Sequence, residues 1–371
     1  MGSAAAYHLT RRGQRVLGLD RFGPAHTRGS SHGGSRLIRQ VCWEHPAYVP
    51  LAQRAYELWR ELEEQTDEPL LLPTGGLFLG PPDCPMIQDA RMVASAEDLP
   101  HEYLSAAEIR RRYRTLVPDD DVVAVSDPAA GVLRPELAVG AQLRLAEAAG
   151  ADLHFGEPVT GWSVAPAGGI SVVTERAEYR AERLVICPGA WAPALLGFTG
   201  MAFSPQRLVV TRFQPADGLA PFLPDRYPFW LWDIGDGGRL GFRGFLYGAP
   251  ALDGPDGGVK LSRVDEQPCN ADTVNRTVTA AEVAEVVALL RPRLGVRLGP
   301  VVEASVCLWT NTPDHHFVLG PHPEHPDVLL AAGCSGHAFK FVPVIGEIVA
   351  DLVVEGKTHH GIALFDPGRA A

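Results

Sequence analysis

The chain has 371 residues, of which 46% are hydrophobic and 21% charged, and its formal net charge at pH 7 is −11. This length favours two domains, the composition is that of a soluble globular protein, and the negative charge argues against a general nucleic-acid binder. No apolar run reaches the roughly 18 residues that span a bilayer and no charged-then-apolar leader is found, so we expect a cytoplasmic protein.

The first twenty residues predict a helix followed by a short strand. Residues 3–12 are small and long-chain residues that favour a helix, and Gly13 stands where a left-handed C-terminal cap is expected. The apolar strand 16–19 then ends at Asp20. The helix begins at Gly2, and the strand ends at an acidic residue about twenty residues later. This pattern is typical of the second half of a dinucleotide-binding βαβ unit.

The first half of that unit is missing from the sequence. No strand precedes Gly2 in this sequence. Only Met1 stands before Gly2, so the first two glycines of the motif G-x-G-x-x-G are absent. We therefore expect that the chain is shortened, that it lacks the first strand of its sheet, and that Met1 is an internal residue of the fingerprint.

The remaining elements alternate between α/β and β-rich stretches, which predicts two interleaved domains that are each discontinuous in sequence. After a loop over 21–36, we expect helices at 47–65, 136–150 and 280–294 and a last helix that ends near Val354, strands at 151–162, 183–191, 304–310 and 327–333, and a β-rich stretch over 207–260.

Metal and disulfide sites are not indicated. The six cysteines contain no C-x-x-C pair. The histidines of "PDHHF" (313–317) and "PHPEHPD" (321–327) could bind a metal, but we favour surface loops interrupted by proline, and we expect no metal.

Five motifs identify a family. In order along the chain, "GSSHGGSRLIR", "CPGAW", "YGAP…GGVK", "CLWTNTPDHHF" and "GCSGHAFKF" closely resemble the monomeric sarcosine oxidase and N-methyltryptophan oxidase family, flavoenzymes of the D-amino acid oxidase superfamily. The resemblance covers nearly the whole chain from Gly2. It implies a monomer with covalently bound FAD that oxidises a secondary-amine amino acid, N-methyl or cyclic, by hydride transfer to flavin N5. Oxygen then reoxidises the flavin and gives hydrogen peroxide.

The resemblance also implies a fold of the α/β (α+β two-domain) class. A Rossmann-like FAD-binding domain, apparently without its first strand, would consist of residues 1–75, 136–210 and 300–371. A β-sheet-rich substrate domain would consist of residues 76–135 and 211–299.

Cys307 is the residue that the family joins to the flavin 8α-methyl group through a thioether. In "ASVCLWT", strand alternation places Cys307 and Trp309 on one face and Val306 and Leu308 on the other. The alternative is an inert buried cysteine, since free cysteine is among the most buried residue types.

Lysine usage is a separate signal. Lys260, Lys340 and Lys357 are the three lysines among 33 Lys and Arg residues, so lysine is kept where a compact ammonium does what a guanidinium cannot. Lys260 matches the family lysine that helps oxygen accept its first electron, because a fixed charge stabilises superoxide. The alternative is a solvated lysine at the end of a strand.

His32 and Arg36 match residues on the other flavin face, where their positive charge favours the anionic reduced ring. We expect them to be catalytic together with Lys260. The alternative is that both are ordinary loop residues.

Arg39 and Lys340 match the pair that holds the substrate carboxylate, through a bidentate fork and a point charge. The alternative for Arg39 is a surface arginine. Tyr247 and Trp309 would line the substrate pocket. Sarcosine-specific enzymes have a histidine where this chain has Val264 and a tyrosine at Trp309, so we expect a substrate other than sarcosine.

The other cofactor-binding residues follow from the family motifs. A glycine turn and a helix with Pro343 in its first turn would aim N–H groups at the flavin pyrimidine edge, unless this is a simple turn. Asp20 should bind the ribose and Val159 should meet the adenine. The expected cofactor-binding residues are Cys307, Gly2, Asp20, Val159, Gly189, Gly336 and His337.

Two alternatives to an oxidase stay open. One is an amine dehydrogenase that passes electrons to another acceptor. The other is a non-catalytic remnant that binds no FAD because its fingerprint is incomplete.

Overall fold

The computed structural model describes residues 1–165, 168–196, 200–235 and 244–369, so residues 236–243 of the expected β-rich stretch lie outside it. The helices are α1 (Gly2–Arg11), α2 (Tyr48–Thr66), α3 (Pro85–Ala96), α4 (Ala106–Arg112), α5 (Pro135–Ala148), α6 (Ala192–Leu196), α7 (Ala280–Leu290) and α8 (Val342–Glu355). Short 3₁₀ turns are η1 (Gly189–Trp191), η2 (Ala220–Phe222), η3 (Arg291–Arg293), η4 (Phe339–Phe341) and η5 (Ala363–Phe365).

The strands within the described residues form five sheets. A large mixed sheet contains β4 (Gly76–Gly80), β5 (Glu102–Ser105), β6 (Val123–Asp127), β13 (Ser204–Pro215), β14 (Phe229–Asp233), β15 (Phe245–Ala249), β16 (Val259–Val264), β17 (Gln267–Pro268) and β18 (Leu298–Asn311). The small sheets are β1 (Leu17–Asp20) with β8 (Asp152–Phe155); β9 (Val159–Val164) with β10 (Ile170–Thr174) and β11 (Glu178–Ala181); β12 (Leu184–Ile186) with β19 (Val318–Pro321) and β20 (Val328–Ala332); and β2 (Arg36–Ile38) with β3 (Leu71–Pro73) and β7 (Gly131–Leu133).

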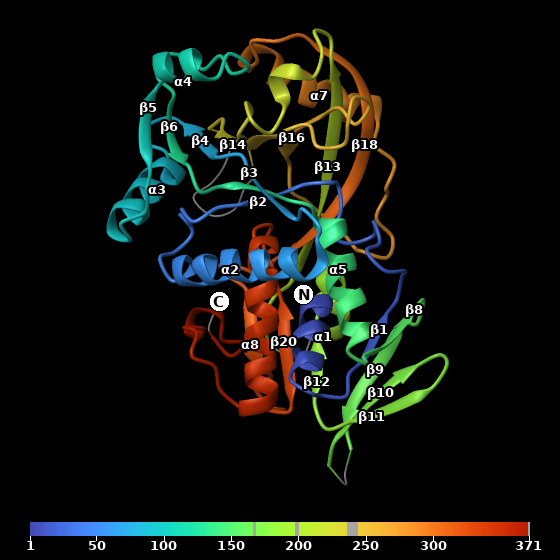
Figure 1. The fold of residues 1–371 in the computed structure, drawn as a ribbon. Helices are drawn as coiled ribbons and strands as arrows, with labels where there is room; N and C mark the ends of the chain where they lie inside the picture. The colour runs from blue at the N-terminus through green and yellow to red at the C-terminus, as the bar shows by residue number, and fades with distance from the viewer. Residues whose placement is uncertain (166–167, 197–199, 236–243, 370–371) are drawn as a thin grey trace.

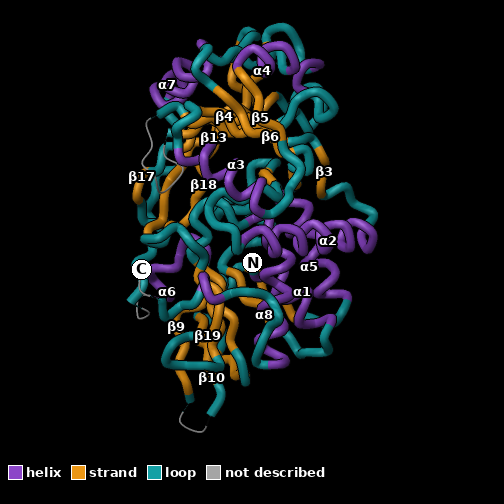
Figure 2. The backbone as a smooth tube through the Cα atoms, turned by 90° about the vertical axis from the view of Figure 1, so that its left-hand side faces the viewer, coloured by secondary structure: helices purple, strands orange, loops and turns teal. Residues whose placement is uncertain are grey.

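The large sheet and the helices α3, α4 and α7 make up one end of the molecule, and α1, α5 and α8 with the β1 and β9–β12 strands make up the other (Figure 1). The two long strands β13 and β18 pair antiparallel and run from the large sheet toward the other end. Figure 2 shows strands at both ends of the molecule, with α1, α2, α5 and α8 grouped beside one another. The mixed α/β architecture expected from the sequence is observed.

Small residues let α1 and α8 pack closely. A Cβ added to Gly346 of α8 would lie 2.7 Å from the Ala4 Cβ, so backbone approaches backbone at this crossing. Helix α8 is apolar and buried over most of its length, and Gly356, with φ +71°, ends it in the left-handed conformation that glycine adopts without strain. The start of α8 is thereby fixed against α1.

Some predicted boundaries are wrong. The single strand expected over 151–162 is two strands, because Gly156, at φ +65°, and Pro158 interrupt it. Strand β8 pairs parallel with β1, whereas β9 pairs antiparallel with β10, so the two halves belong to different sheets. No helix in the described part of the chain is both long and apolar enough to cross a membrane.

Candidate active site

One large cavity lies between the two ends of the molecule, with a volume of about 1940 Å³. Its walls come from the start of α1, the β1 and β8–β9 segments, the η1 and η4 turns, and the large-sheet strands β13, β15, β16 and β18. Nearly all of the predicted site residues line it: Gly2, Asp20, Arg36, Arg39, Val159, Gly189, Tyr247, Lys260, Val264, Cys307, Trp309, Gly336, His337 and Lys340. The exception is His32, which lines a neighbouring cavity of about 760 Å³.

The cavity meets α1 at the helix N-terminus. Met1, Gly2 and Ser3 are part of its wall, so the free N–H groups of the first helical turn lie beside it. Asp20 ends β1, and its Oδ1 accepts a hydrogen bond from the Phe22 amide at 2.7 Å. A helix N-terminus favours an anion such as a phosphate.

Pairing between β13 and β18 positions Cys307. Leu208 is its partner in the antiparallel register, and Cys307 is buried at the cavity wall. The Arg36 guanidinium Nη2 lies 3.5 Å from the Cys307 Sγ and also donates to the Ser30 carbonyl. The sulfur is therefore held beside the positively charged guanidinium of Arg36.

His32 differs from the expectation. Burial first, and then the neighbouring Arg36, lower the pKa of His32 to about 4. Its imidazole is neutral at pH 7, so the positive charge expected at this position comes from Arg36 alone. The sequence shows the residue types but not the burial that removes the charge.

Lys260 is buried, and two backbone carbonyl groups hold its ammonium group. Its Nζ donates to the Gly33 carbonyl at 3.1 Å and to the Ser35 carbonyl at 3.0 Å, and it lies 5.8 Å from the centre of the Tyr247 ring. Burial, followed by the charge of Arg36, places the pKa of Lys260 well below its usual value. The alternative of a solvated strand-end lysine does not match these contacts.

Arg39 and Lys340 face a third charged group, Glu44. The Arg39 guanidinium forms an ion pair with the Glu44 carboxylate and stacks on Trp43, 3.4 Å from the ring centre. Burial alone would raise the pKa of Glu44, but the charges of Arg39 and Lys340 outweigh it and hold that pKa far below its usual range. Lys340 Nζ donates to the His337 carbonyl at 2.7 Å.

Sequence reasoning missed Glu44. It lies five positions after Arg39, on a loop without helix or strand periodicity. The signal that could have found it is chemical, because an arginine that is 1% exposed needs a nearby carboxylate. Arg39 is thus a buried residue and not the surface arginine of the alternative.

The wall between Lys260 and Lys340 is aromatic and apolar. Tyr247 stacks parallel to Phe229, with ring centres 6.3 Å apart, and Val264, Leu231 and Trp309 complete the surface. Burial raises the pKa of Tyr247 to about 12, so its hydroxyl keeps its proton at pH 7. Phe229 and Leu231 are additional cavity residues that the motifs do not indicate.

The turn before α8 approaches Trp309 closely. Gly336 has φ +77°, and a Cβ at this position would lie 3.0 Å from the Trp309 ring. Helix α8 has Pro343 in its first turn, as predicted, and the short turn η4 precedes it. A glycine is required here for the turn and for its contact with the cavity wall.

The residues around the cavity fit FAD. Its volume exceeds the roughly 300–1,000 Å³ of ordinary ligand pockets, as a dinucleotide requires. The α1 N-terminus and the Asp20 carboxylate suit a pyrophosphate and a ribose, and Arg36 and Lys260 supply positive charge where an isoalloxazine would gain electrons.

Comparison with known proteins identifies the family of the chain. The model of the FAD dependent oxidoreductase family matches residues 1–352. A monomeric sarcosine oxidase of Streptomyces avermitilis is 48% identical over all of this chain and 95% of its own length. An N-methyl-L-tryptophan oxidase of Citrobacter koseri is 33% identical over 96% of this chain and 93% of its own.

Solved structures agree on the fold. NikD, described as an unusual amino acid oxidase essential for nikkomycin biosynthesis, matches with a TM-score of 0.86 and 26% identity over 100% of this chain and 95% of its own. A glycine oxidase of Geobacillus kaustophilus has the same fold, with a TM-score of 0.80 and 21% identity over 100% of this chain and 96% of its own. The resemblance predicted from the sequence motifs is confirmed, and the chain belongs to the family of FAD-dependent oxidoreductases.

Proposed function

We propose that this protein oxidises the secondary amine of an N-methyl or cyclic amino acid and uses oxygen as the electron acceptor. The C–H bond beside the amine breaks, its hydrogen and electron pair leave, and the nitrogen lone pair forms the C=N bond of an imine. Water hydrolyses the imine, and oxygen takes up the two electrons and two protons as hydrogen peroxide. The observation that carries this proposal is that Arg39, Lys340 and Lys260 line the same cavity as Cys307.

FAD, when bound, supplies a two-electron acceptor that oxygen can reoxidise. The residues that would hold it are Cys307, Gly2, Asp20, Val159, Gly189, Gly336 and His337, all of which line the cavity.

Arg39 and Lys340 bind the substrate carboxylate in this proposal. Together with Glu44 they carry a net charge of about +1, which a substrate carboxylate neutralises. Fixing the carboxylate orients the amine end of the substrate within the cavity.

No side-chain base is required if the amine binds in its neutral form. Tyr247 keeps its proton, since its pKa is about 12, and so can donate a hydrogen bond but cannot accept a proton at pH 7. His337 is neutral, because burial lowers its pKa to about 3. The chain therefore orients the substrate and shields it from water without taking its proton.

The apolar wall of Phe229, Leu231 and Val264 favours a substrate with a larger side chain than sarcosine. Two relatives carry names of N-methyl amino acid oxidases, which supports the same substrate class.

Peroxide production tests the function. The purified, flavin-containing protein should release hydrogen peroxide with at least one of sarcosine, N-methyl-L-tryptophan, L-proline or L-pipecolate. Substrate oxidation that reduces only an artificial acceptor would identify a dehydrogenase instead, and the absence of bound flavin would contradict the proposal altogether.

We expect Cys307 to carry the flavin covalently. The Cys307 Sγ lies at the wall of the cavity that would hold the flavin, 3.5 Å from the Arg36 guanidinium. Acid-denatured wild-type protein should keep its yellow colour on the polypeptide, and Cys307→Ala should release it into the supernatant. Cys42, a buried cysteine outside the cavity wall, provides the control, since Cys42→Ala should retain the colour. Colour that leaves the wild-type protein on precipitation would refute the linkage.

Carboxylate binding should weaken as the pH rises through about 8. Burial, and then Arg39, lower the pKa of Lys340 to about 8, so its positive charge is present below this pH and lost above it. The measurement is the inhibition constant of acetate, which has no amine to titrate, on both sides of this pH.

The Glu44→Gln variant is an internal check on that pH dependence. The Glu44 charge raises the pKa of Lys340, so its removal should move the loss of acetate binding to lower pH. An acetate inhibition constant that does not change with pH would show that Lys340 is not part of the carboxylate site.

A further inference from the structure

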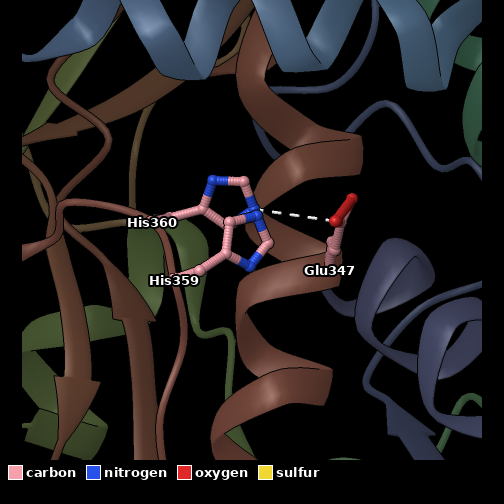
Figure 3. Close-up of side chains that lie close together, drawn as sticks. All are labelled: Glu347, His359 and His360. Atoms are coloured by element: carbon pink, nitrogen blue, oxygen red, sulfur yellow. Dashed lines mark ion pairs between the residues drawn. The ribbon is translucent and has the colours of Figure 1, made fainter.

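A cluster of metal-ligand side chains lies outside the cavity. Glu347 on α8 and the consecutive His359 and His360, which follow the end of that helix, have ligand atoms within 4.8 Å of one another (Figure 3). None of the three lines the large cavity. Among the described residues, this is the one group of three or more His, Cys, Asp or Glu side chains close enough to hold a metal ion.

The distance between the ligand atoms of Glu347 and His360 is close to that between two ligands of one metal ion. Glu347 Oε1 and His360 Nε2 are 3.6 Å apart, which is within the range of an ion pair (Figure 3) but longer than a hydrogen bond. Two ligands of one tetrahedral zinc ion, each about 2.05 Å from the metal, are about 3.4 Å apart. The His360 side chain is 7% exposed, and its Nε2 has no hydrogen-bond partner. A buried ring nitrogen therefore faces a carboxylate oxygen at the spacing that a metal ion would bridge.

Glu347 and the neighbouring Asp351 each have one carboxylate oxygen held by arginine. Arg54 Nε binds the Glu347 Oε2 at 3.0 Å, and Glu347 Oε1 lies on the side of His360. Arg12 binds the Asp351 Oδ1, while Asp351 Oδ2 accepts a hydrogen bond from Thr358 Oγ1 at 2.7 Å and lies 3.9 Å from His359 Nδ1. The arginines orient the carboxylates as outer partners do in many metal sites.

The local charge is negative in spite of the two arginines. Besides Glu347 and Asp351, three further carboxylates pair with Arg54 or Arg12, and these are Glu57, Glu61 and Glu355. The nearby His8 of α1 adds no positive charge at pH 7, because burial lowers its pKa to about 4. The surroundings therefore attract a cation.

We propose that Glu347, His359 and His360 form a binding site for a divalent transition-metal ion. Two imidazoles and one carboxylate are a ligand set that zinc accepts, with water in the fourth position. The His359 side chain is 74% exposed and leaves the site open to solvent, so an ion can enter without unfolding. The ion cross-links the segment after Gly356 to α8 and has a structural role.

The test uses the full-length, flavin-containing protein after treatment with a chelator. Calorimetric titration with Zn²⁺ alone should give one ion per chain, and Zn²⁺ should raise the melting temperature in a way that the chelator reverses. Because loss of an outer partner already weakens metal binding by roughly 10- to 100-fold, loss of a ligand in His359→Ala or His360→Asn should weaken it by about 100-fold or more.

A matched control comes from another pair of neighbouring histidines. His322 and His325 have ring centres 4.9 Å apart and lie outside the cluster, so His325→Ala should bind Zn²⁺ as the wild type does. Because His359 is exposed, its alanine variant should fold normally, and its melting temperature without metal provides that check. The proposal is overturned if the wild type shows no saturable binding, or if binding survives in the His359→Ala, His360→Asn double variant.

Discussion

The Lys260→Met variant should react with oxygen about 100-fold or more slowly in its reduced form, while its reduction by substrate changes little. Losing one preorganised charge where negative charge develops typically costs on the order of 10²- to 10³-fold in rate. Lys260 is buried, and the Gly33 and Ser35 carbonyls hold its Nζ in place, so the charge needs no reorganisation when oxygen is reduced. Methionine keeps much of the side-chain volume, so the cavity wall remains filled.

Stopped-flow measurement of the two half-reactions separates these effects. Lys357→Met is the matched control, because Lys357 is exposed and should leave both rates unchanged. The wild-type oxidation rate should also fall as the pH rises and Lys260 loses its charge, since burial lowers the pKa of Lys260, and this pH dependence should vanish in Lys260→Met. Equal slowing of both half-reactions would mean that Lys260 does not act on oxygen.

Local patterns predict the helices of this fold better than its sheets. Helices α1, α2, α5, α7 and α8 lie close to their expected ranges, because apolar spacing, prolines and glycine caps are local signals. The local patterns do not predict helices α3, α4 and α6. Pairing partners are far apart in sequence, as Leu208 and Cys307 illustrate, and strand patterns do not specify which strands meet.

The sequence also predicts the residue types of the site better than their environment. Family motifs identify Cys307, Lys260 and Arg39, but the neutral state of His32 depends on burial that only the folded chain has. The sequence directs attention to two other histidine-rich loops, whereas the clustered pair, His359 and His360, meets Glu347 from beyond the end of α8. These residues are close in sequence, but only the path of the chain after Gly356 shows that their side chains meet.

Arg39→Ala should raise the KM for an amino acid substrate by about 10- to 100-fold and should affect much less a secondary amine in which methyl replaces the carboxylate. Hydrogen bonds to charged groups contribute about 1.5–3 kcal/mol, and only the amino acid loses one. Lys340 remains in the variant, so some affinity for the carboxylate is retained. Steady-state kinetics with the two substrates gives both effects in one protein preparation.

The change in KM of Arg39→Ala must be separated from the effect of the substitution on Glu44, the ion-pair partner of Arg39. Arg39→Ala leaves the buried Glu44 carboxylate without its ion pair, and breaking a buried pair typically costs roughly 3–5 kcal/mol of stability. The double variant Arg39→Ala, Glu44→Gln removes both charges, so it should regain thermal stability without regaining affinity for the amino acid. If the double variant binds the amino acid as tightly as the wild type, Arg39 acts only by neutralising Glu44. If Arg39→Ala raises the KM of the amino acid and of the amine by the same factor, the carboxylate is bound elsewhere in the cavity.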